Sequence, residues 1–209
     1  MTQPDHEEVA RRAAQRDRDA FGQLYDEHLN AIYRYVLYKV GDGSVAEELT
    51  AEVFYKAWER IDRFEWRNLP FQHWLVTIAR NVVVDHYRGR RRATSPIDEL
   101  RDAATDEPGP DEQLARDQEA QALRGALARL QDEQRDVLIL RIIEGYSHSE
   151  AAAVLGKSVV AVRQIQVRAL RSLYKQLQAQ EALTDVPGAA GGFRGFPAPK
   201  RKPSEEPAR

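Results

Sequence analysis

The sequence contains no cysteine among its 209 residues. This excludes disulfides, thiolate metal ligands and a cysteine nucleophile, and it fits a reducing, cytoplasmic setting. Long apolar runs are also missing: none approaches the ~18 residues that a membrane-spanning helix needs, so we expect no membrane insertion. The first 20 residues mix acidic and basic groups without an apolar stretch, and we therefore expect no secretory signal.

A large charge of either sign is missing too, because 31 Lys and Arg stand against 33 Asp and Glu. A protein that coats nucleic acid by bulk electrostatics needs a strong positive charge, so any nucleic-acid function must come from local concentrations of charge. The five histidines show no metal-ligand spacing, and no glycine-rich phosphate loop is present. We expect no metal, no cofactor and no enzymatic activity.

Proline is rare in two long spans, since eight of the 10 prolines lie near residues 96–110 or after residue 186. A proline costs a helix interior about 3 kcal/mol, so the spans without it are where helices can run. The predicted parts are an N-terminal segment (1–18), a first block (19–92), a linker (93–112), a second block (113–180) and a Pro/Gly-rich tail (181–209). We expect an all-α fold of two small helical domains, a flexible acidic linker and a disordered tail.

The first block reads as three helices. Apolar residues recur at helical spacing over 21–40, and the Gly-Asp-Gly run at 41–43 is expected to end that helix. The segment 44–47 has the Ser-x-x-Glu pattern of a capping box, which predicts the start of a second helix. A loop over 62–70 then precedes a third helix, over about 71–92.

The third helix ends in a basic run. Over 80–92 there are five arginines and one aspartate, and the loop before the helix carries Phe64 and Trp66. Cations beside aromatic rings suit single-stranded or melted DNA, because exposed bases stack on rings while phosphates attract cations. Arginines at a helix C-terminus also complement the helix dipole, so this pattern alone leaves both interpretations open.

The sharpest local pattern lies within 130–175. One helix is expected to end at Gly145, and the segment 147–150 is a second capping box that begins a short helix. Gly156 can supply the positive φ of a tight turn, and Ser158 can cap the longer helix that follows. A short helix, a glycine turn and a longer helix together predict a helix-turn-helix.

Charge favours a DNA-reading role for that second helix. The span 157–175 holds five basic residues and no acidic one, whereas 130–150 holds five acidic and two basic residues. A positive helix face is what phosphate contact requires. The predicted DNA contacts are Arg163 and Gln164 toward base edges, Val167, and Arg168, Arg171 and Lys175 toward phosphates. The alternative is a helical bundle with a solvated basic face.

Two sets of motifs resemble the extracytoplasmic-function (ECF) sigma factors of bacterial RNA polymerase. The AEELTAEVF run at 46–54 resembles the D-A-E-D-L-T-Q-E-V-F segment of that family, with Val45 and Ala51 departing from it. The segment 74–88 resembles the W-L-x-x-I-A-x-N-x-x-x-D-x-x-R helix that reads the minus-ten element. The segments 130–138, 144–147 and 162–169 resemble the domain that reads the minus-thirty-five element, with Gln131 where proline is usual and Gln164 where serine is common.

This resemblance implies a promoter-specificity subunit that binds core RNA polymerase, at its β′ clamp helices and β flap, and promoter DNA. It implies a flipped base held in the loop over 62–71, a linker that follows the RNA exit channel, and an anti-sigma factor as inhibitor. The implied polymerase contacts are Glu47, Glu48, Leu49, Thr50, Glu52, Val53 and Phe54. The implied minus-ten contacts are Phe64, Trp66, Asn81, Asp85, Arg88, Arg90, Arg91 and Arg92.

The main alternative is a stand-alone helix-turn-helix transcriptional regulator, with the first block as a sensor or dimerisation domain. Such a regulator has no need of the polymerase-docking segment or of the arginine-rich helix end, and these two features separate the hypotheses. A scaffolding protein whose basic faces are merely solvated is a further alternative.

Overall fold

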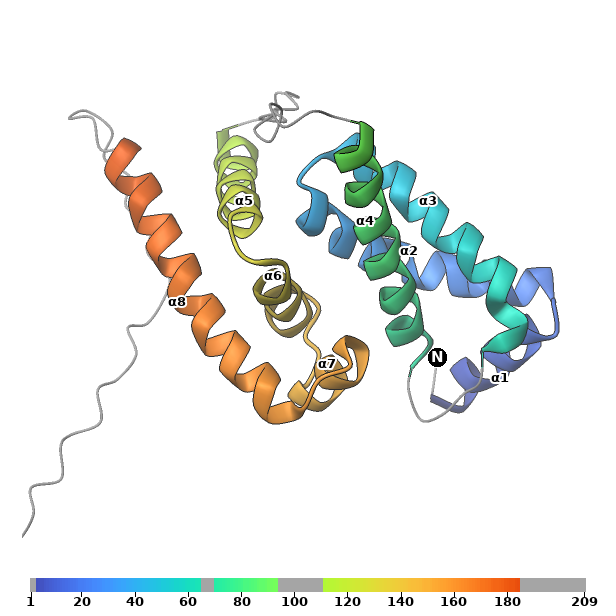
Figure 1. The fold of residues 1–209 in the computed structure, drawn as a ribbon. Coiled ribbons are helices and arrows are strands. Elements are labelled where there is room, and N and C mark those ends of the chain that lie inside the picture. The colour runs from blue at the N-terminus through green and yellow to red at the C-terminus, as the bar shows by residue number, and fades with distance from the viewer. Residues whose placement is uncertain (1–2, 65–69, 94–110, 185–209) are drawn as a thin grey trace, which may run out of the picture.

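The computed structural model describes residues 3–64, 70–93 and 111–184, and within these ranges it contains helices and no strand (Figure 1). This confirms the predicted all-α fold. The α-helices of the described residues are α1 (Gln3–Ala14), α2 (Arg18–Val40), α3 (Gly43–Arg60), α4 (Phe71–Ala93), α5 (Asp111–Ala128), α6 (Asp132–Leu138), α7 (His148–Leu155) and α8 (Val159–Thr184). A 3₁₀ turn (Ile61–Arg63) follows α3, and a π-helical turn (Ile139–Ile143) follows α6. Most of the predicted linker and tail lies outside the described residues.

Helices α1 to α4 form the first half of the molecule. The Asp17 carboxylate caps α2 by accepting hydrogen bonds from two backbone N–H groups, and Gly41 ends that helix with φ 78°, as the sequence predicted. Helix α1 was not expected. Its apolar side chains Val9, Ala10 and Ala13 are buried, and the helix packs against α2, so the N-terminal segment belongs to the core.

The capping box predicted at Ser44 and Glu47 is wrong. Helix α3 begins two residues earlier than that cap implies, at Gly43, and its cap is Asp42, whose carboxylate accepts a hydrogen bond from the Val45 N–H at 3.0 Å. A carboxylate caps a helix as well as a hydroxyl does, and Asp42 comes first after the turn at Gly41. Ser44 is therefore an exposed residue of the first helical turn.

Helices α5 to α8 form the second half, and the predicted helix-turn-helix is confirmed there. Ser147 and Glu150 form the reciprocal capping box at the start of α7, with distances of 3.1 Å and 2.6 Å. Gly156 has φ 62° at the turn, and the Ser158 hydroxyl accepts a hydrogen bond from the Ala161 N–H at 3.1 Å. Helix α5, which precedes this motif, was not placed individually from the sequence, although the second block was expected to be helical.

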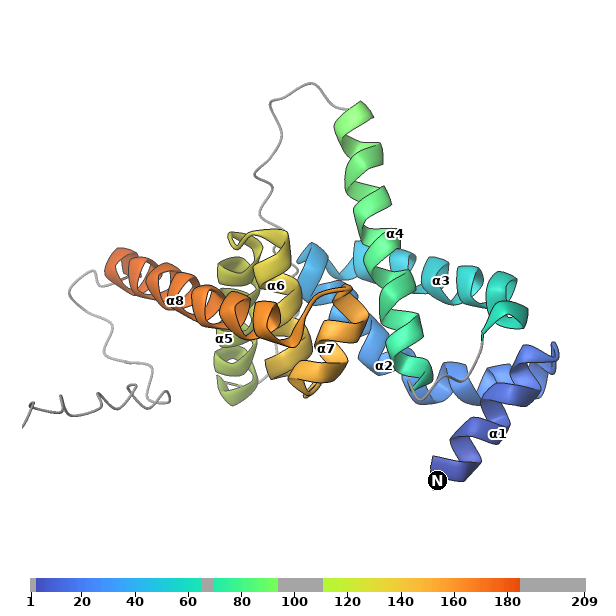
Figure 2. The same cartoon turned by 60° about the horizontal axis from the view of Figure 1, so that its bottom comes forward.

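The two halves are in direct contact, through both polar and apolar side chains. Helix α4 contacts α7, and α2 contacts α5 and the π-helical turn. Figure 1 shows α6 and α7 between α8 and the first four helices, while Figure 2 shows the C-terminal end of α4 standing out from the body. One apolar core runs from the first half into the second, so the two-domain plan includes a direct contact that the sequence did not predict.

Candidate nucleic-acid interface

The outer face of α8 carries every residue that the sequence predicted for duplex contact. Val162, Ile165 and Ala169 are buried, and they orient the helix. The predicted contact residues Arg163, Gln164, Val167, Arg168, Arg171 and Lys175 are all exposed. Four of them, Arg163, Gln164, Val167 and Arg168, line one shallow hollow on the surface. The helix therefore presents cations, an amide and a methyl-bearing side chain together, which is the chemistry that a major groove can accept.

Lys157 does not belong to this exposed basic face. Its ammonium group lies 2.8 Å from the Glu133 carboxylate of α6, so a neighbouring acid neutralises its charge. The five basic residues counted over 157–175 therefore reduce to four on the outer face of α8.

Hydrogen bonds from Ser147 keep the pKa of Glu150 below its usual value. The Glu150 carboxylate therefore remains charged, and the capping box at the start of α7 is maintained.

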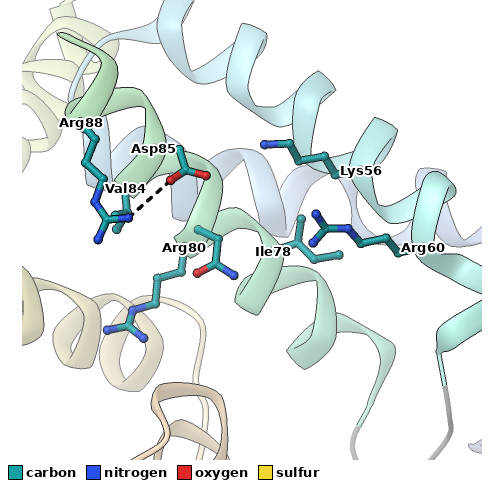
Figure 3. A pocket seen from close by; sticks show the side chains of 8 residues that line it. Lys56, Arg60, Ile78, Arg80, Val84, Asp85 and Arg88 are labelled. Carbon is teal, nitrogen blue, oxygen red and sulfur yellow. Dashed lines mark ion pairs between the residues drawn. The ribbon is translucent and has the colours of Figure 1, made fainter. Parts of the chain in front are cut away.

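A second candidate surface is a cavity of about 470 Å³ between α3 and α4. The residues that line it are Lys56 and Arg60 from α3, and Ile78, Arg80, Asn81, Val84, Asp85 and Arg88 from α4 (Figure 3). It brings together Asn81, Asp85 and Arg88, which the sequence predicted for contact with minus-ten DNA. The sequence reasoning missed Lys56 and Arg60, because they come from a different helix.

Positive charge dominates this cavity. Four cations and the single carboxylate of Asp85 line it, and Asp85 lies 3.8 Å from Arg88 on the same helix (Figure 3). Lys56 is paired with Glu52 at 2.6 Å. The neutral amide of Asn81, which can donate and accept hydrogen bonds, is exposed among these charges. Such a lining suits a phosphate together with the polar edge of an unpaired base.

The structure describes some, but not all, of the aromatic and arginine side chains that the sequence predicted for contact with minus-ten DNA. Phe64 is half-buried, with its ring centroid 5.1 Å from that of Phe71 and 5.2 Å from that of Trp74. Trp66, with the rest of 65–69, lies outside the described residues. Arg90 is exposed near the end of α4. The side chains of Arg91 and Arg92 are not among those described. DNA contact by these residues stays a prediction.

The predicted polymerase segment divides into an outer and an inner face of α3. Glu47 and Glu48 are exposed and Glu52 is half-buried. Leu49, Thr50, Val53 and Phe54 are buried, and the Thr50 hydroxyl donates to the Ala46 carbonyl at 2.6 Å. The buried side chains hold the helix in place, and a docking role for them stays a prediction. Tyr55, which the sequence analysis did not name, is 63% exposed on the same helix, and its hydrogen bond to Glu59 raises its pKa.

The histidines are the first side chains to consider for a catalytic or metal-binding role, and the sequence analysis expected neither role for them. Asp85, the neighbour of His86 in sequence, pairs with Arg88, while the His86 ring lies against Tyr87. Across 3–64, 70–93 and 111–184, no group of three or more His, Asp and Glu side chains could hold a metal ion. Within those ranges no helix combines the length and apolar character needed to cross a membrane.

A helix-turn-helix with a basic outer face, joined to a helical domain with a cationic cavity, defines a two-part DNA-binding protein. Comparisons with known proteins agree. Residues 24–93 match the family Sigma-70 region 2, and residues 126–175 match Sigma-70, region 4.

The chain is 39% identical over 171 residues to the ECF RNA polymerase sigma factor BldN of Streptomyces coelicolor, a match that covers 81% of this chain and 65% of BldN. It is 32% identical to the ECF RNA polymerase sigma factor SigX of Bacillus subtilis, over 80% of this chain and 89% of SigX. Among solved structures, the sigma factor RpoE in complex with the anti-sigma factor NepR from Bartonella quintana matches with a TM-score of 0.64 and 27% identity, covering 76% of this chain and 96% of RpoE.

The chain belongs to the ECF RNA polymerase sigma factors. A protein of this family directs promoter-specific transcription initiation, and the alternative of a stand-alone regulator is not favoured. The prediction made from the two sets of motifs is thereby confirmed at the level of family and function.

Proposed function

We propose that this sigma factor joins core RNA polymerase through the outer face of α3 and reads promoter DNA with two separate surfaces. The α8 face reads the minus-thirty-five duplex, and the cavity between α3 and α4 receives the opened strand at the minus-ten element. The observation that carries this proposal is the cavity, which collects Asn81, Asp85 and Arg88 with two cations from a neighbouring helix. The protein acts in the cytoplasm, by binding alone, without a cofactor or covalent chemistry of its own.

The α8 surface suits duplex DNA. Arg163 and Gln164 are exposed in the first turns of α8, where side chains of a recognition helix reach base edges. Arg168, Arg171 and Lys175 follow further along the helix, where contacts to phosphates fix its position. Because phosphate contacts release counterions, binding at this surface weakens as the salt concentration rises.

The cavity suits single-stranded DNA. A base that leaves the stack exposes its hydrogen-bonding edge, and the Asn81 amide can pair with a donor or an acceptor on it. Lys56, Arg60 and Arg88 line the cavity with that amide. Lys56 pairs with Glu52 and Arg88 with Asp85, but the lining still holds more cations than carboxylates for the neighbouring phosphates. The half-buried ring of Phe64 lies in the segment that leads into α4, and it offers an apolar side to the same strand.

Besides promoter DNA, the partners of this chain are core RNA polymerase and an inhibitory anti-sigma factor. The β′ clamp helices meet α3, and the β flap meets the region 4 half of the molecule. The related RpoE of Bartonella quintana is found in complex with the anti-sigma factor NepR. By that likeness, an anti-sigma factor holds this protein inactive until a signal releases it.

The test of this function is initiation in a purified system. Core RNA polymerase supplied with this protein should start transcription at a specific set of promoters, which a map of transcription starts would reveal. The same core enzyme without the protein should not start there. Identical start sites and yields in the two reactions would reject the proposal.

Removing the charge of Glu48 should weaken docking on polymerase. Glu48 is exposed on the outer face of α3, where a partner's cations can reach it. We expect Glu48→Gln to reduce affinity for the core enzyme about three- to tenfold, mainly through slower association, with less sensitivity to salt. Glu8→Gln on α1 is the matched control and should leave affinity unchanged. Equal capture of core enzyme by the two variants would exclude Glu48 from the interface.

A further inference from the structure

A buried cluster of charged and hydroxyl groups lies where the two halves meet. Asp136 of α6 is 1% exposed. Its carboxylate accepts a hydrogen bond from the Tyr35 hydroxyl at 2.9 Å and lies 2.9 Å from the Lys39 ammonium and 3.2 Å from the Arg80 guanidinium. Tyr35 and Lys39 belong to α2, and Arg80 belongs to α4. These four residues, here called the junction cluster, join one helix of region 4 to two helices of region 2.

Further polar contacts surround the junction cluster. Arg34 of α2 donates two hydrogen bonds to Glu144, at 3.1 Å and 2.9 Å, and Lys39 also lies 3.4 Å from Asp132. Burial and the neighbouring carboxylate of Asp136 keep the pKa of Tyr35 above its ordinary value, so its hydroxyl remains a donor. The contact between the halves is therefore specific in its geometry as well as apolar.

Buried ion pairs of this kind suit a contact that opens. Desolvation of the charges offsets much of their attraction, so an ionic junction contributes less net stability than an apolar one of the same size. When the halves separate, each charge of the cluster regains water, so this polar part of the contact opposes opening less than the apolar core that the two halves share. The junction cluster can therefore fix one closed arrangement without making it permanent.

The proposed function requires the halves to separate. At 3.4 Å per base pair, promoter elements centred about 25 base pairs apart lie roughly 85 Å apart along the duplex. In the closed arrangement, Arg80 of the cavity lies 3.2 Å from Asp136 of region 4. A domain of about 60 residues has a radius of gyration of about 10 Å, which places the α8 face within roughly 30 Å of Asp136. The closed chain cannot reach both elements at once.

Arg80 links the closed arrangement to the DNA surface. It lines the cavity with Asn81. Its side chain is labelled in Figure 3, and its guanidinium is paired with the Asp136 carboxylate of α6. While the halves are closed, a cation of the cavity is directed toward a protein carboxylate. Separation of the halves releases that cation for a phosphate.

We propose that the junction cluster is a latch that holds the free sigma factor closed, and that binding of polymerase and promoter favours the open form. This inference rests on the proposed function, because the need to open follows from reading two distant promoter elements. Asp136 has no part in DNA or polymerase contact here. Its role is to lower the fraction of free chains that are competent to bind.

The latch is tested first on the free protein. The chain has no cysteine, so Gln23→Cys on α2 and Ala153→Cys on α7, both at exposed positions, provide a unique pair of dye sites. Single-molecule energy transfer should show mainly short distances in this labelled chain. Asp136→Asn, which removes the charge but keeps the shape, should shift a large fraction to long distances. Arg11→Gln, which breaks an exposed pair far from the junction, should not.

Two outcomes of this measurement would overturn the latch. One is the same distance distribution for the Asp136→Asn variant as for the parent chain. The other is a shift that is accompanied by loss of helical circular dichroism, which would mean unfolding rather than opening. Tyr35→Phe, which removes only one hydrogen bond of the cluster, should give a smaller shift in the same direction with unchanged helicity, and the absence of that shift would also count against the latch.

The regulatory role is tested with polymerase. Apparent affinity scales with the competent fraction, so Asp136→Asn should bind core enzyme about fivefold tighter than the parent chain if the free protein is mostly closed. Unchanged or weaker binding would overturn the regulatory role. If neither chain joins polymerase while the dyes still report opening, the proposed function fails and the latch remains, so the two failures are distinguishable.

Discussion

Replacing Arg135 by methionine should lower the free energy of unfolding by about 3–5 kcal/mol. Arg135 is 8% exposed, and its guanidinium donates to four backbone carbonyls. Three of them, at Leu127, Ala128 and Leu130, lie at the end of α5 and just beyond it, with distances of 3.0, 2.7 and 3.2 Å; the fourth, at Lys39, lies 2.8 Å away at the end of α2. Methionine keeps most of the apolar stem but removes all four of these hydrogen bonds, after which the Lys39 carbonyl keeps the Tyr87 hydroxyl and the Leu127 carbonyl keeps the Leu130 N–H as donors.

Urea denaturation of the full chain, followed by circular dichroism, would measure this loss. Arg129→Met is the matched control: Arg129 is exposed near the same helix end, and its replacement should change the free energy of unfolding by less than about 0.5 kcal/mol. Arg135→Lys should be intermediate, because one ammonium group cannot serve four carbonyls in a fixed planar fork. Equal midpoints and slopes for Arg135→Met and Arg129→Met would contradict the assigned role.

Sequence patterns could not predict that Arg135 and Asp136 are buried. In the sequence both stand in a mostly acidic stretch before the helix-turn-helix, where charged residues usually face water. Their partners Lys39 and Tyr35 lie about a hundred positions earlier in the chain. Helical periodicity identifies the apolar side of each helix, but it does not show which charges meet across two domains. The junction therefore became visible only in three dimensions.

Local signals were more reliable where one residue type dominates the chemistry of a turn. The capping box at Ser147 and the positive φ at Gly156 were predicted correctly, because both depend only on neighbouring residues. The same reasoning failed at Ser44, since Asp42 offered a competing cap two residues earlier. It also missed α1, whose burial depends on the tertiary contact with α2.

The two candidate surfaces show the same division. The α8 face could be predicted, because its exposed residues follow directly from which residues of one helix face inward. The cavity could be predicted only on its α4 side. Lys56 and Arg60 have the spacing of one helix face, but nothing in that spacing indicates that α3 and α4 form a common cavity. A pair of cations near the end of α3 was the one signal available.

Replacing Arg163 by alanine should weaken recognition of the minus-thirty-five duplex by about 1–3 kcal/mol, which is roughly five- to 160-fold in affinity. Arg163 is exposed near the start of α8, and it lines the same hollow as Gln164, Val167 and Arg168. A guanidinium there can donate two hydrogen bonds to one guanine, and alanine can donate none. The loss should therefore be large on the preferred sequence and small on unrelated duplexes.

Arg171→Ala provides the contrast that separates base reading from phosphate contact. Arg171 is also exposed on α8, two helical turns further on, where it is placed for the backbone. Its loss should weaken binding to all sequences alike and reduce the salt dependence by about one unit of the log–log slope. Holoenzyme binding to preferred and scrambled upstream duplexes at several salt concentrations would measure both effects. If Arg163→Ala weakened binding to the two duplexes equally, it would act on phosphates as Arg171 does, and base recognition would have to be assigned to Gln164 and Val167.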